Sequence, residues 1–310
     1  MMFMKNALLI INPVSGRSMI SEYTDDILSL LRKEGYQAQV LLTKRKDDAE
    51  YFAREYGANA SLIVCCGGDG TLSETVNGVV PLQNHPVIVY IPTGTTNDFS
   101  KNMGLSGDIL RSIIDLRHGV PKTIDAGRFD ARYFIYVASF GLFAESSYAT
   151  PRGLKQRLGH LAYVITGTKE LLNLKSYRVR VTDAEGNCYE DDYIYGSVSN
   201  STSIGGLMRF EDGVVNLRDG RHEVVLIRRP KNLHEFNDIV HHVLSGKYDS
   251  ELMTVFSTSK VTVESENPID WSLDGEHART EKPVTIVNVP RALRLMFPKP
   301  DGNPAASAQN

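Results

Sequence analysis

The sequence predicts two domains, an α/β domain with a parallel sheet followed by an antiparallel β-sandwich domain. In the first part, up to about residue 130, short continuous apolar runs alternate with amphipathic stretches. That pattern is typical of parallel strands covered by helices on both faces. Further along, apolar and polar residues alternate, as from Arg178 to Val181, and turn residues separate the runs, which favours antiparallel strands. A chain of 310 residues is long enough for two such domains.

The first domain is expected to contain four buried strands, at Leu8–Ile11, Val40–Leu42, Leu62–Cys66 and Val87–Ile91. Apolar residues at helical spacing predict helices after Tyr23, after Ala49, after Gly70 and from Leu110. Asp47 with Glu50, and Thr71 with Glu74, have the spacing of capping boxes at two of the helix starts. Gly119–Pro121 is expected to end the last helix.

The second domain is expected to contain strands near Val179–Val181, Tyr193–Val198, Glu223–Ile227, Met253–Ser257, Lys260–Val263 and Ile269–Leu273. Helices are predicted at Leu161–Leu174 and around Phe236–Leu244. The resulting boundaries are residues 1–128 for the first domain and 129–283 for the second. Residues 284–300, with apolar runs at Val284–Val289 and Ala292–Phe297, form a C-terminal segment that can return to the first domain, and residues 301–310 form a disordered tail.

Composition narrows the class of protein. The apolar fraction of 42% and the charged fraction of 23% are those of an ordinary globular chain. A net charge of -3 gives no basic field that would attract nucleic acid, so no nucleic-acid partner is expected. No apolar run reaches the roughly 18 residues of a membrane span. Cys65 and Cys66 are adjacent in an apolar run, which suits neither a disulfide framework nor a zinc site, so a reducing, cytoplasmic location is expected.

The strongest local signal is Gly67-Gly68-Asp69-Gly70-Thr71, directly after an expected strand and before an expected helix. Glycines let the backbone approach a ligand closely, and the helix N-terminus offers free N–H groups to a phosphate. Asp69 repels phosphate, so its natural partner is a metal ion carried by the phosphates. The alternative is a tight strand-to-helix turn with a polar cap.

Two more polar loops, Asn12–Gly16 and Pro92–Asp98, follow other strands of the same sheet. Ligands of open α/β sheets bind beyond the carboxyl ends of the strands, so the three loops are expected to form one nucleotide site. Thr43, at the end of another strand, is a candidate for the same pocket. Walker-type G-x-x-x-x-G-K-[ST] spacing is missing from the sequence.

An ordered set of motifs resembles the diacylglycerol kinase catalytic-domain family, and its soluble bacterial lipid kinases in particular. The matching segments are Asn12–Gly16, Gly67–Gly78, Pro92–Phe99, Ile124–Gly127, Asp219–Gly220 and Leu273–Glu276. The resemblance implies an ATP-binding α/β domain like those of 6-phosphofructokinases and NAD kinases, then a β-sandwich domain. It also implies phosphoryl transfer from ATP, with Mg²⁺, to a lipid hydroxyl, by default from diacylglycerol to phosphatidic acid.

The resemblance also implies roles for individual residues. Glu276 would be the general base. Asp69, Asp125 and Asp219 would form an acidic network around a catalytic Mg²⁺, with Asp69 and Asp219 as its ligands. The ATP site would comprise Asn12, Pro13, Val14, Ser15, Gly16, Thr43, Gly67, Gly68, Asp69, Gly70, Thr71, Leu72, Ser73, Glu74, Gly94, Thr95, Asn97 and Asp98.

Two departures from the family pattern stand out. Ser73 replaces a usual asparagine, a small change because a hydroxyl remains. Arg218 replaces an aspartate that binds a second, structural Mg²⁺ in some bacterial members, and a guanidinium cannot ligate a cation. Arg218 could instead pair with Glu211 or Asp212, so no second metal site is expected.

Other readings stay open. An NAD kinase-like enzyme shares the GGDG loop and a β-rich second domain, and a nucleotide-binding regulator without turnover is the non-enzyme alternative. The lipid itself stays open, as does a homodimer. A kinase of this kind would meet its lipid substrate at a membrane surface by transient peripheral contact, for which the basic candidates are Arg152, Lys155, Arg157, Lys169 and Lys175.

Overall fold

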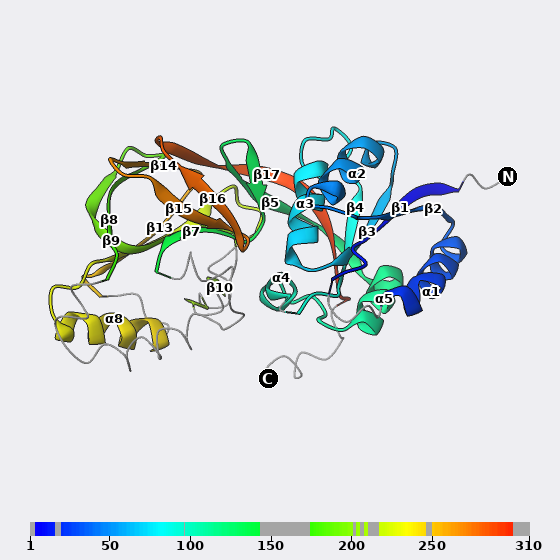
Figure 1. Cartoon of the computed structure of the whole chain (residues 1–310), viewed down its shortest axis with the longest axis horizontal. Coiled ribbons are helices and arrows are strands. Elements are labelled where there is room, and N and C mark those ends of the chain that lie inside the picture. The colour runs from blue at the N-terminus through cyan, green and yellow to red at the C-terminus, as the bar shows by residue number, and fades with distance from the viewer. Residues whose placement is uncertain are drawn as a thin grey trace. The chain divides into compact units, whose positions relative to one another are not determined.

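The structure is a computed structural model that describes residues 4–15, 20–95, 97–142, 174–200, 203–204, 208–209, 217–245 and 250–299 (Figure 1). The chain forms two compact units. Unit 1 comprises the residues up to Thr123 together with those from Leu293 onward, and unit 2 comprises Ile124–Ala292. No helix within the described ranges is long and apolar enough to cross a membrane. The predicted Leu161–Leu174 helix lies outside the described residues apart from Leu174.

The sheet of unit 1 is parallel, as predicted. Its strands lie in the order β2 (Tyr36–Leu42), β1 (Lys5–Ile11), β3 (Leu62–Gly67) and β4 (Val87–Pro92). A fifth parallel strand is the end of β17 (Val284–Phe297), where Arg294 pairs with Val87 of β4. Strands β3 and β4 are buried along their whole length, which explains their unbroken apolar sequences.

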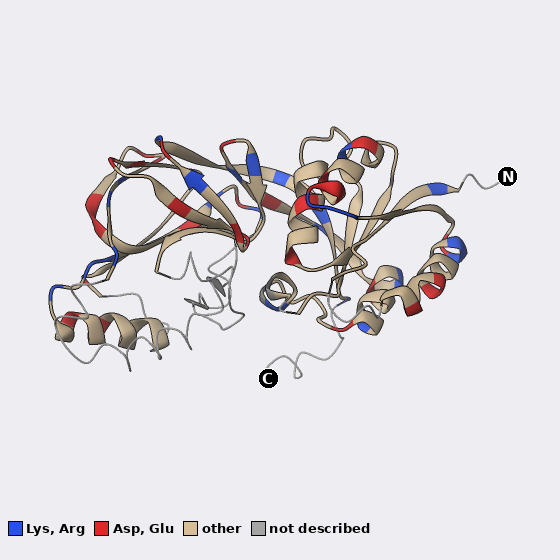
Figure 2. Ribbon diagram, in the orientation of Figure 1, with Lys and Arg blue, Asp and Glu red and all other residues tan. Residues whose placement is uncertain are grey.

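Helices cover both faces of this sheet (Figure 1). Helices α1 (Ile20–Lys33) and α5 (Ile109–His118) pack on the face that carries Leu9, Val64 and Val89. Glu22 lies in the first turn of α1, and Arg32 and Lys33 lie in its last turn (Figure 2), a charge distribution that the helix dipole favours.

Helices α2 (Asp48–Gly57) and α3 (Asp69–Val79) pack closely against each other, since a Cβ on Gly78 would lie 2.5 Å from the carbonyl oxygen of Glu50. A short helix, α4 (Asp98–Asn102), follows β4.

Both predicted capping boxes are wrong. Asp47 has a left-handed backbone with φ of 68° and makes no side-chain cap. Instead, the Asp48 carboxylate accepts hydrogen bonds from the Lys44 and Arg45 amides. Helix α3 begins at Asp69, with Gly68 as its N-cap, and so starts before Thr71.

Unit 2 is built of antiparallel strands, as predicted. They lie in the order β16 (Glu276–Thr280), β15 (Ile269–Leu273), β7 (Val137–Gly141), β9 (Cys188–Ser199), β8 (Tyr177–Asp183), β14 (Lys260–Ser265) and β17. Strand β12 (His222–Arg228) pairs with β9 and with β13 (Met253–Thr258). Strand β5 (Val120–Phe129) pairs with β6 (Arg132–Phe134), and β10 (Ser203–Ile204) pairs with β11 (Met208–Arg209).

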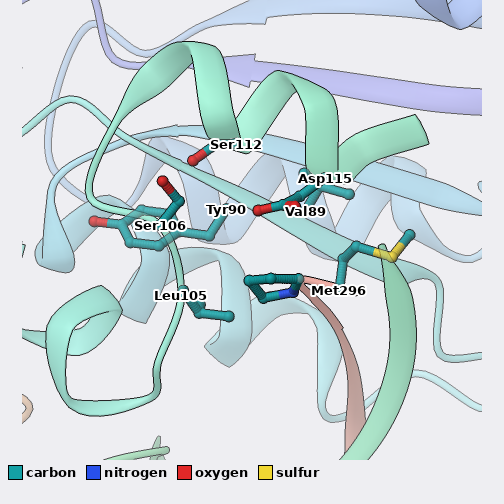
Figure 3. Close-up of a pocket in the computed structure, with 8 residues that line it drawn as sticks. Val89, Tyr90, Leu105, Ser106, Ser112, Asp115 and Met296 are labelled. Carbon is teal, nitrogen blue, oxygen red and sulfur yellow. The ribbon is translucent and has the colours of Figure 1, made fainter. Parts of the chain in front are cut away.

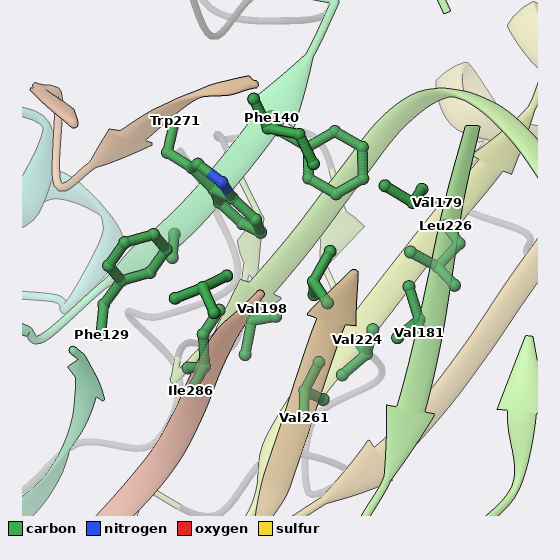
Figure 4. Packing of buried hydrophobic residues seen from close by; sticks show 14 of the residues in the cluster. Phe129, Phe140, Val179, Val181, Val198, Val224, Leu226, Val261, Trp271 and Ile286 are labelled. Atoms are coloured by element: carbon green, nitrogen blue, oxygen red, sulfur yellow. The ribbon is translucent and has the colours of Figure 1, made fainter. Parts of the chain in front are cut away.

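The main core of unit 2 gathers aromatic and β-branched side chains from many strands. Trp271 is fully buried, with its ring centroid 5.1 Å from that of Phe129 and 4.9 Å from that of Phe140 (Figure 4). Trp271 is therefore a core residue. On the second face of β12, Val225 and Ile227 pack against helix α8 (Leu233–Ser245), whose apolar stripe includes Phe236.

Two long strands continue across the boundaries between the units. The first domain was predicted to end at residue 128, but the division at Thr123 falls inside β5. The apolar runs predicted on either side of Pro290 belong to one strand, β17. Within this strand Arg291 has a left-handed φ of 54°, next to the division between Ala292 and Leu293.

Candidate active site

The three polar loops predicted to form one site do meet in unit 1. The loop after β1 reaches the loop after β3, because Asn12 Nδ2 donates to Thr71 Oγ1 at 3.1 Å. It reaches the loop after β4 through the Thr93 hydroxyl, which donates to Ser15 Oγ at 3.1 Å. The Thr93 amide donates to the Gly67 carbonyl at 2.9 Å and joins the other two loops. The carboxyl ends of β1, β3 and β4 therefore converge.

Glycines make this convergence possible. A Cβ on Gly94 would lie 2.7 Å from Gly68 Cα and 2.8 Å from Asn97 Oδ1, distances that real Cβ atoms do not reach. A Cβ on Gly67 would lie 2.4 Å from Thr71 Cβ. Gly68 is the N-cap of α3, and the amide groups at a helix N-terminus are suited to bind an anion.

Asp69 stands at the centre of this arrangement and is partly exposed. Its Oδ1 atom accepts a hydrogen bond from the Phe99 amide at 3.2 Å and lies 3.4 Å from the Tyr90 hydroxyl. These contacts orient the carboxylate from the side of the β4–α4 loop. Asn97, with a left-handed φ of 49°, closes that loop by donating from Nδ2 to the Gly94 carbonyl at 2.8 Å.

The other residues predicted for the ATP site fall into distinct positions. Thr43 is buried at the end of β2, with its amide donating to the Ile11 carbonyl. Leu72 and Ser73 are buried in α3, whereas Glu74 Oε2 accepts from the Ala49 amide and so links α3 to α2. Exposed positions are occupied by Pro13, Val14 and Thr95. Gly16 lies outside the described residues, and for Asp98 the structure describes only the backbone, at the start of α4.

Glu276 follows a two-residue hairpin turn in unit 2. Asp274 and Gly275 both have positive φ, 50° and 93°, as a type I′ turn between β15 and β16 requires. The Asp274 carboxylate accepts hydrogen bonds from the amides of Ile135, Tyr136 and Val137 at 2.8–2.9 Å. The aspartate of the turn therefore ties the turn to the start of β7. Glu276 is half-buried and pairs with Leu273 across this turn.

Asp125 lies on β5 and contacts the loop of unit 2 that carries Asp219. Asp125 is fully buried, and its two oxygens accept from the amides of Gly220 at 2.8 Å and Arg291 at 2.7 Å. Asp219 is exposed and accepts from the Arg221 amide at 3.0 Å. Asp125 thus holds the loop that carries Asp219. Arg218 in the same loop is exposed, and its two suggested partners lie outside the described residues.

Unit 2 also holds a buried acid that the sequence did not single out. Glu223, beside Ser199 at the start of β12, is 6% exposed. Burial, reinforced by the nearby Asp219 charge, raises the pKa of Glu223 to about 7. In the sequence, the only signal for this buried acid was a charged residue at the beginning of an apolar strand.

The side chains available as metal ligands suit a cation that is already bound to the phosphates of a nucleotide. Among the described residues, no three His, Cys, Asp or Glu side chains gather to hold a metal ion. Mg²⁺ commonly takes only one or two carboxylates and completes its shell with phosphate and water. Asp69, beside a backbone cradle without side chains, matches that requirement.

A small pocket between β4, α5 and the end of β17 is distinct from the site that the three loops form. Val89, Tyr90, Ser112 and Asp115 are among its lining residues (Figure 3), and its volume of about 10 Å³ has room for roughly one water molecule. It is therefore too small for a nucleotide.

Both parts of the chain match known protein families. Residues 6–129 match the family model of the diacylglycerol kinase catalytic domain, and residues 137–297 match that of the YegS C-terminal NAD kinase beta sandwich-like domain. The chain is 31% identical to a diacylglycerol kinase of Bacillus subtilis (strain 168), over 96% of this chain and 97% of the relative. It is 29% identical to a diacylglycerol kinase of Staphylococcus epidermidis, over 95% and 93%.

Solved structures share the fold. A crystal structure of a diacylglycerol kinase from Bacillus anthracis str. Sterne superposes with a TM-score of 0.70 at 22% identity, covering 97% of this chain and 98% of that one. Another structure from the same organism gives a TM-score of 0.78 at 23% identity, with the same coverage. Motifs, fold and full-length similarity together place the chain in the diacylglycerol kinase family, as an ATP-dependent lipid kinase.

Proposed function

We propose that the protein phosphorylates the hydroxyl of diacylglycerol with ATP and Mg²⁺, producing phosphatidic acid and ADP. The observation that carries the proposal is the meeting of three strand-end loops at Gly68 and Gly94, directly beside Asp69. A backbone cradle next to a single oriented carboxylate suits a nucleotide polyphosphate with a divalent cation.

In unit 1 the proposed task is to bind and orient the nucleotide. The first-turn amides of α3 receive phosphate oxygens, and Asn12 and Thr71 hold two of the loops in register. Asp69 provides the protein ligand for Mg²⁺, with Asp219 of unit 2 as the second candidate. Bound Mg²⁺ neutralises charge on the phosphates during transfer.

In unit 2 the proposed task is to handle the acceptor. Glu276 accepts the proton of the lipid hydroxyl while the hydroxyl oxygen forms a bond to the γ-phosphorus. The bond from that phosphorus to the β-phosphate bridging oxygen breaks, and ADP leaves. The Asp274 contacts to β7 fix the turn that presents Glu276. Asp125 has a positioning role, since it holds the loop of Asp219.

The acceptor is proposed to be met at a membrane surface. Of the basic residues suggested for docking, only Lys175 lies within the described part, where its Nζ is 3.8 Å from Asp270 Oδ2 and 5.1 Å from the Tyr177 ring centroid. The competing candidate is an NAD kinase-like activity, because the second family model is described as an NAD kinase beta sandwich-like domain.

The role of Glu276 can be tested with one substitution and a matched control. Glu276→Gln keeps the shape and removes the basicity, so turnover should fall by ~10² or more while ATP affinity is unchanged. Glu281→Gln makes the same chemical change at an exposed position just beyond β16 and should leave turnover unaltered. Initial rates at saturating lipid and ATP, with nucleotide affinity from calorimetry, give both quantities. Retention of most turnover in Glu276→Gln would remove Glu276 as the base.

A further inference from the structure

The Tyr90 hydroxyl lies between two loops of the nucleotide site. Tyr90 is on β4, is 4% exposed, and interrupts an otherwise aliphatic strand. Its hydroxyl is 3.4 Å from Asp69 Oδ1 and 3.4 Å from Asn97 Oδ1. Figure 3 shows the hydroxyl at the end of the ring directed away from Asp115 and Met296. A buried tyrosine normally finds a hydrogen-bond partner, and here the candidates are one residue of the GGDG loop and one of the β4–α4 loop.

Both neighbouring oxygens are acceptors, so the phenol must be the donor. Asn97 Nδ2 donates to the Gly94 carbonyl at 2.8 Å, which fixes Oδ1 as the side facing Tyr90. The carboxylate of Asp69 carries no proton to donate when ionised. With one proton for two acceptors, the bond to the charged Asp69 is the stronger choice because charge-assisted hydrogen bonds exceed neutral ones.

The ring of Tyr90 is held in place by its neighbours. It meets the Phe99 ring edge to face, with centroids 6.2 Å apart and an interplanar angle of 69°. The Phe99 amide donates to the same Asp69 oxygen, Oδ1, at 3.2 Å. One residue pair therefore supplies both the donors and the packing on one side of the carboxylate.

We infer that Tyr90 is a positioning residue for the metal-binding carboxylate of Asp69. The phenol and the Phe99 amide both engage Oδ1 and so fix the orientation of the carboxylate. This inference rests on the proposed role of Asp69 as a Mg²⁺ ligand. Hydrogen-bond partners behind a metal ligand typically change metal affinity about 10- to 100-fold when they are removed.

The test measures metal binding directly, without turnover. Mn²⁺ replaces Mg²⁺ as a spectroscopic probe, and its binding to the full chain with a non-hydrolysable ATP analogue is followed by electron paramagnetic resonance. Tyr90→Phe keeps the ring against Phe99 and removes only the hydroxyl, so Mn²⁺ should bind about tenfold more weakly or worse. The analogue alone, titrated without metal, should bind as it does to the parent. Tyr36→Phe, at the start of β2, removes a hydroxyl from the same unit and should change neither value.

The variants distinguish a failure of the inference about Tyr90 from a failure of the proposed metal role of Asp69. Asp69→Asn should abolish protein-dependent Mn²⁺ binding. If Asp69→Asn binds Mn²⁺ like the parent, the metal role of Asp69 is wrong and the inference falls with it. If Asp69→Asn loses the metal but Tyr90→Phe retains parental affinity, only the role of Tyr90 is overturned. Thermal unfolding of each metal-free variant identifies a loss of fold, and Tyr90→Thr, which restores a hydroxyl without the reach of the phenol, should bind metal as weakly as Tyr90→Phe.

Discussion

Glu223 is a buried acidic residue, and its burial disfavours the charged form of the carboxyl group. The residue is 6% exposed, and its Oε2 atom has no hydrogen-bond partner in the part of the chain that the structure describes. Burial raises the pKa from 4.5 in the unfolded chain to about 7. Between these values the folded chain holds a proton that the unfolded chain has lost. Stability is therefore greatest below the unfolded pKa and declines as the pH rises through about 7.

Replacing Glu223 by an uncharged residue of the same shape should remove this decline. For Glu223→Gln, the free energy of unfolding relative to the parent should grow by about 1–3 kcal/mol between pH 5 and pH 8. Urea unfolding of both chains at the two pH values measures the difference. Glu190→Gln is the control, since Arg180 holds the pKa of the exposed Glu190 below its usual range, so Glu190 stays ionised in both states and its difference from the parent should not change between these two pH values. A difference that stays constant with pH would show that Glu223 is ionised in the folded chain.

The sequence anticipated some single residues and missed others for a physical reason. The place of Asp69 and the glycines around it, between a strand and a helix, could be predicted because the signal lies within five consecutive residues. Tyr90 read as one more buried residue of an apolar strand, because its partners Asp69 and Asn97 come from other segments. The bonds of Asp274 to amides near Tyr136 could not be predicted, because they join positions more than a hundred residues apart.

At the scale of elements, the β15–β16 hairpin depends on a side chain as well as on its turn. The Asp274 carboxylate serves three amides at the start of β7, and the Asp274 amide donates to the Val137 carbonyl. The turn and the neighbouring strand are thus a single hydrogen-bonded assembly.

Asp274→Ala should destabilise unit 2 by about 2–4 kcal/mol, because three amides lose a charged acceptor. Asp130→Ala is the matched control: Asp130 also has a left-handed φ, 50°, in the β5–β6 turn, so its loss reports mainly the backbone preference, roughly 1 kcal/mol. Asp274→Asn, which tolerates the turn and retains one oxygen, should fall between the two. Denaturant unfolding of the three variants gives the order. Equal effects of Asp274→Ala and Asp130→Ala would reduce Asp274 to a turn former.

Element types were easier to predict than element boundaries. Parallel strands such as Leu62–Gly67 are continuous apolar runs, and their positions follow directly from hydropathy. The capping boxes failed because sequence spacing does not reveal backbone conformation, and Asp47 adopts a left-handed one. Strand β5 was missed because Pro121 looked like a helix terminator, although a proline is acceptable near the start of a strand.

At the scale of the whole molecule, the proposed chemistry is divided between two units. Unit 1 contains the nucleotide loops and Asp69, and unit 2 contains the Asp274-Gly275-Glu276 turn and the Asp219 loop. The two-domain organisation followed from the change in sequence pattern near residue 130. The exact position of the division could not be predicted from that change. Strands β5 and β17 continue through the division, and a continuous strand gives no break in composition.

The most direct test of the central claim is the identity of the phosphorylated product. The purified chain is incubated with labelled ATP and Mg²⁺ and with one acceptor at a time in mixed micelles. The acceptors are diacylglycerol, a sphingoid base, ceramide, a polyprenol and phosphatidylglycerol, and NAD is offered in solution. The account predicts labelled phosphatidic acid from diacylglycerol and no labelled product from NAD. Efficient phosphorylation of NAD, with none of the lipids labelled, would contradict it.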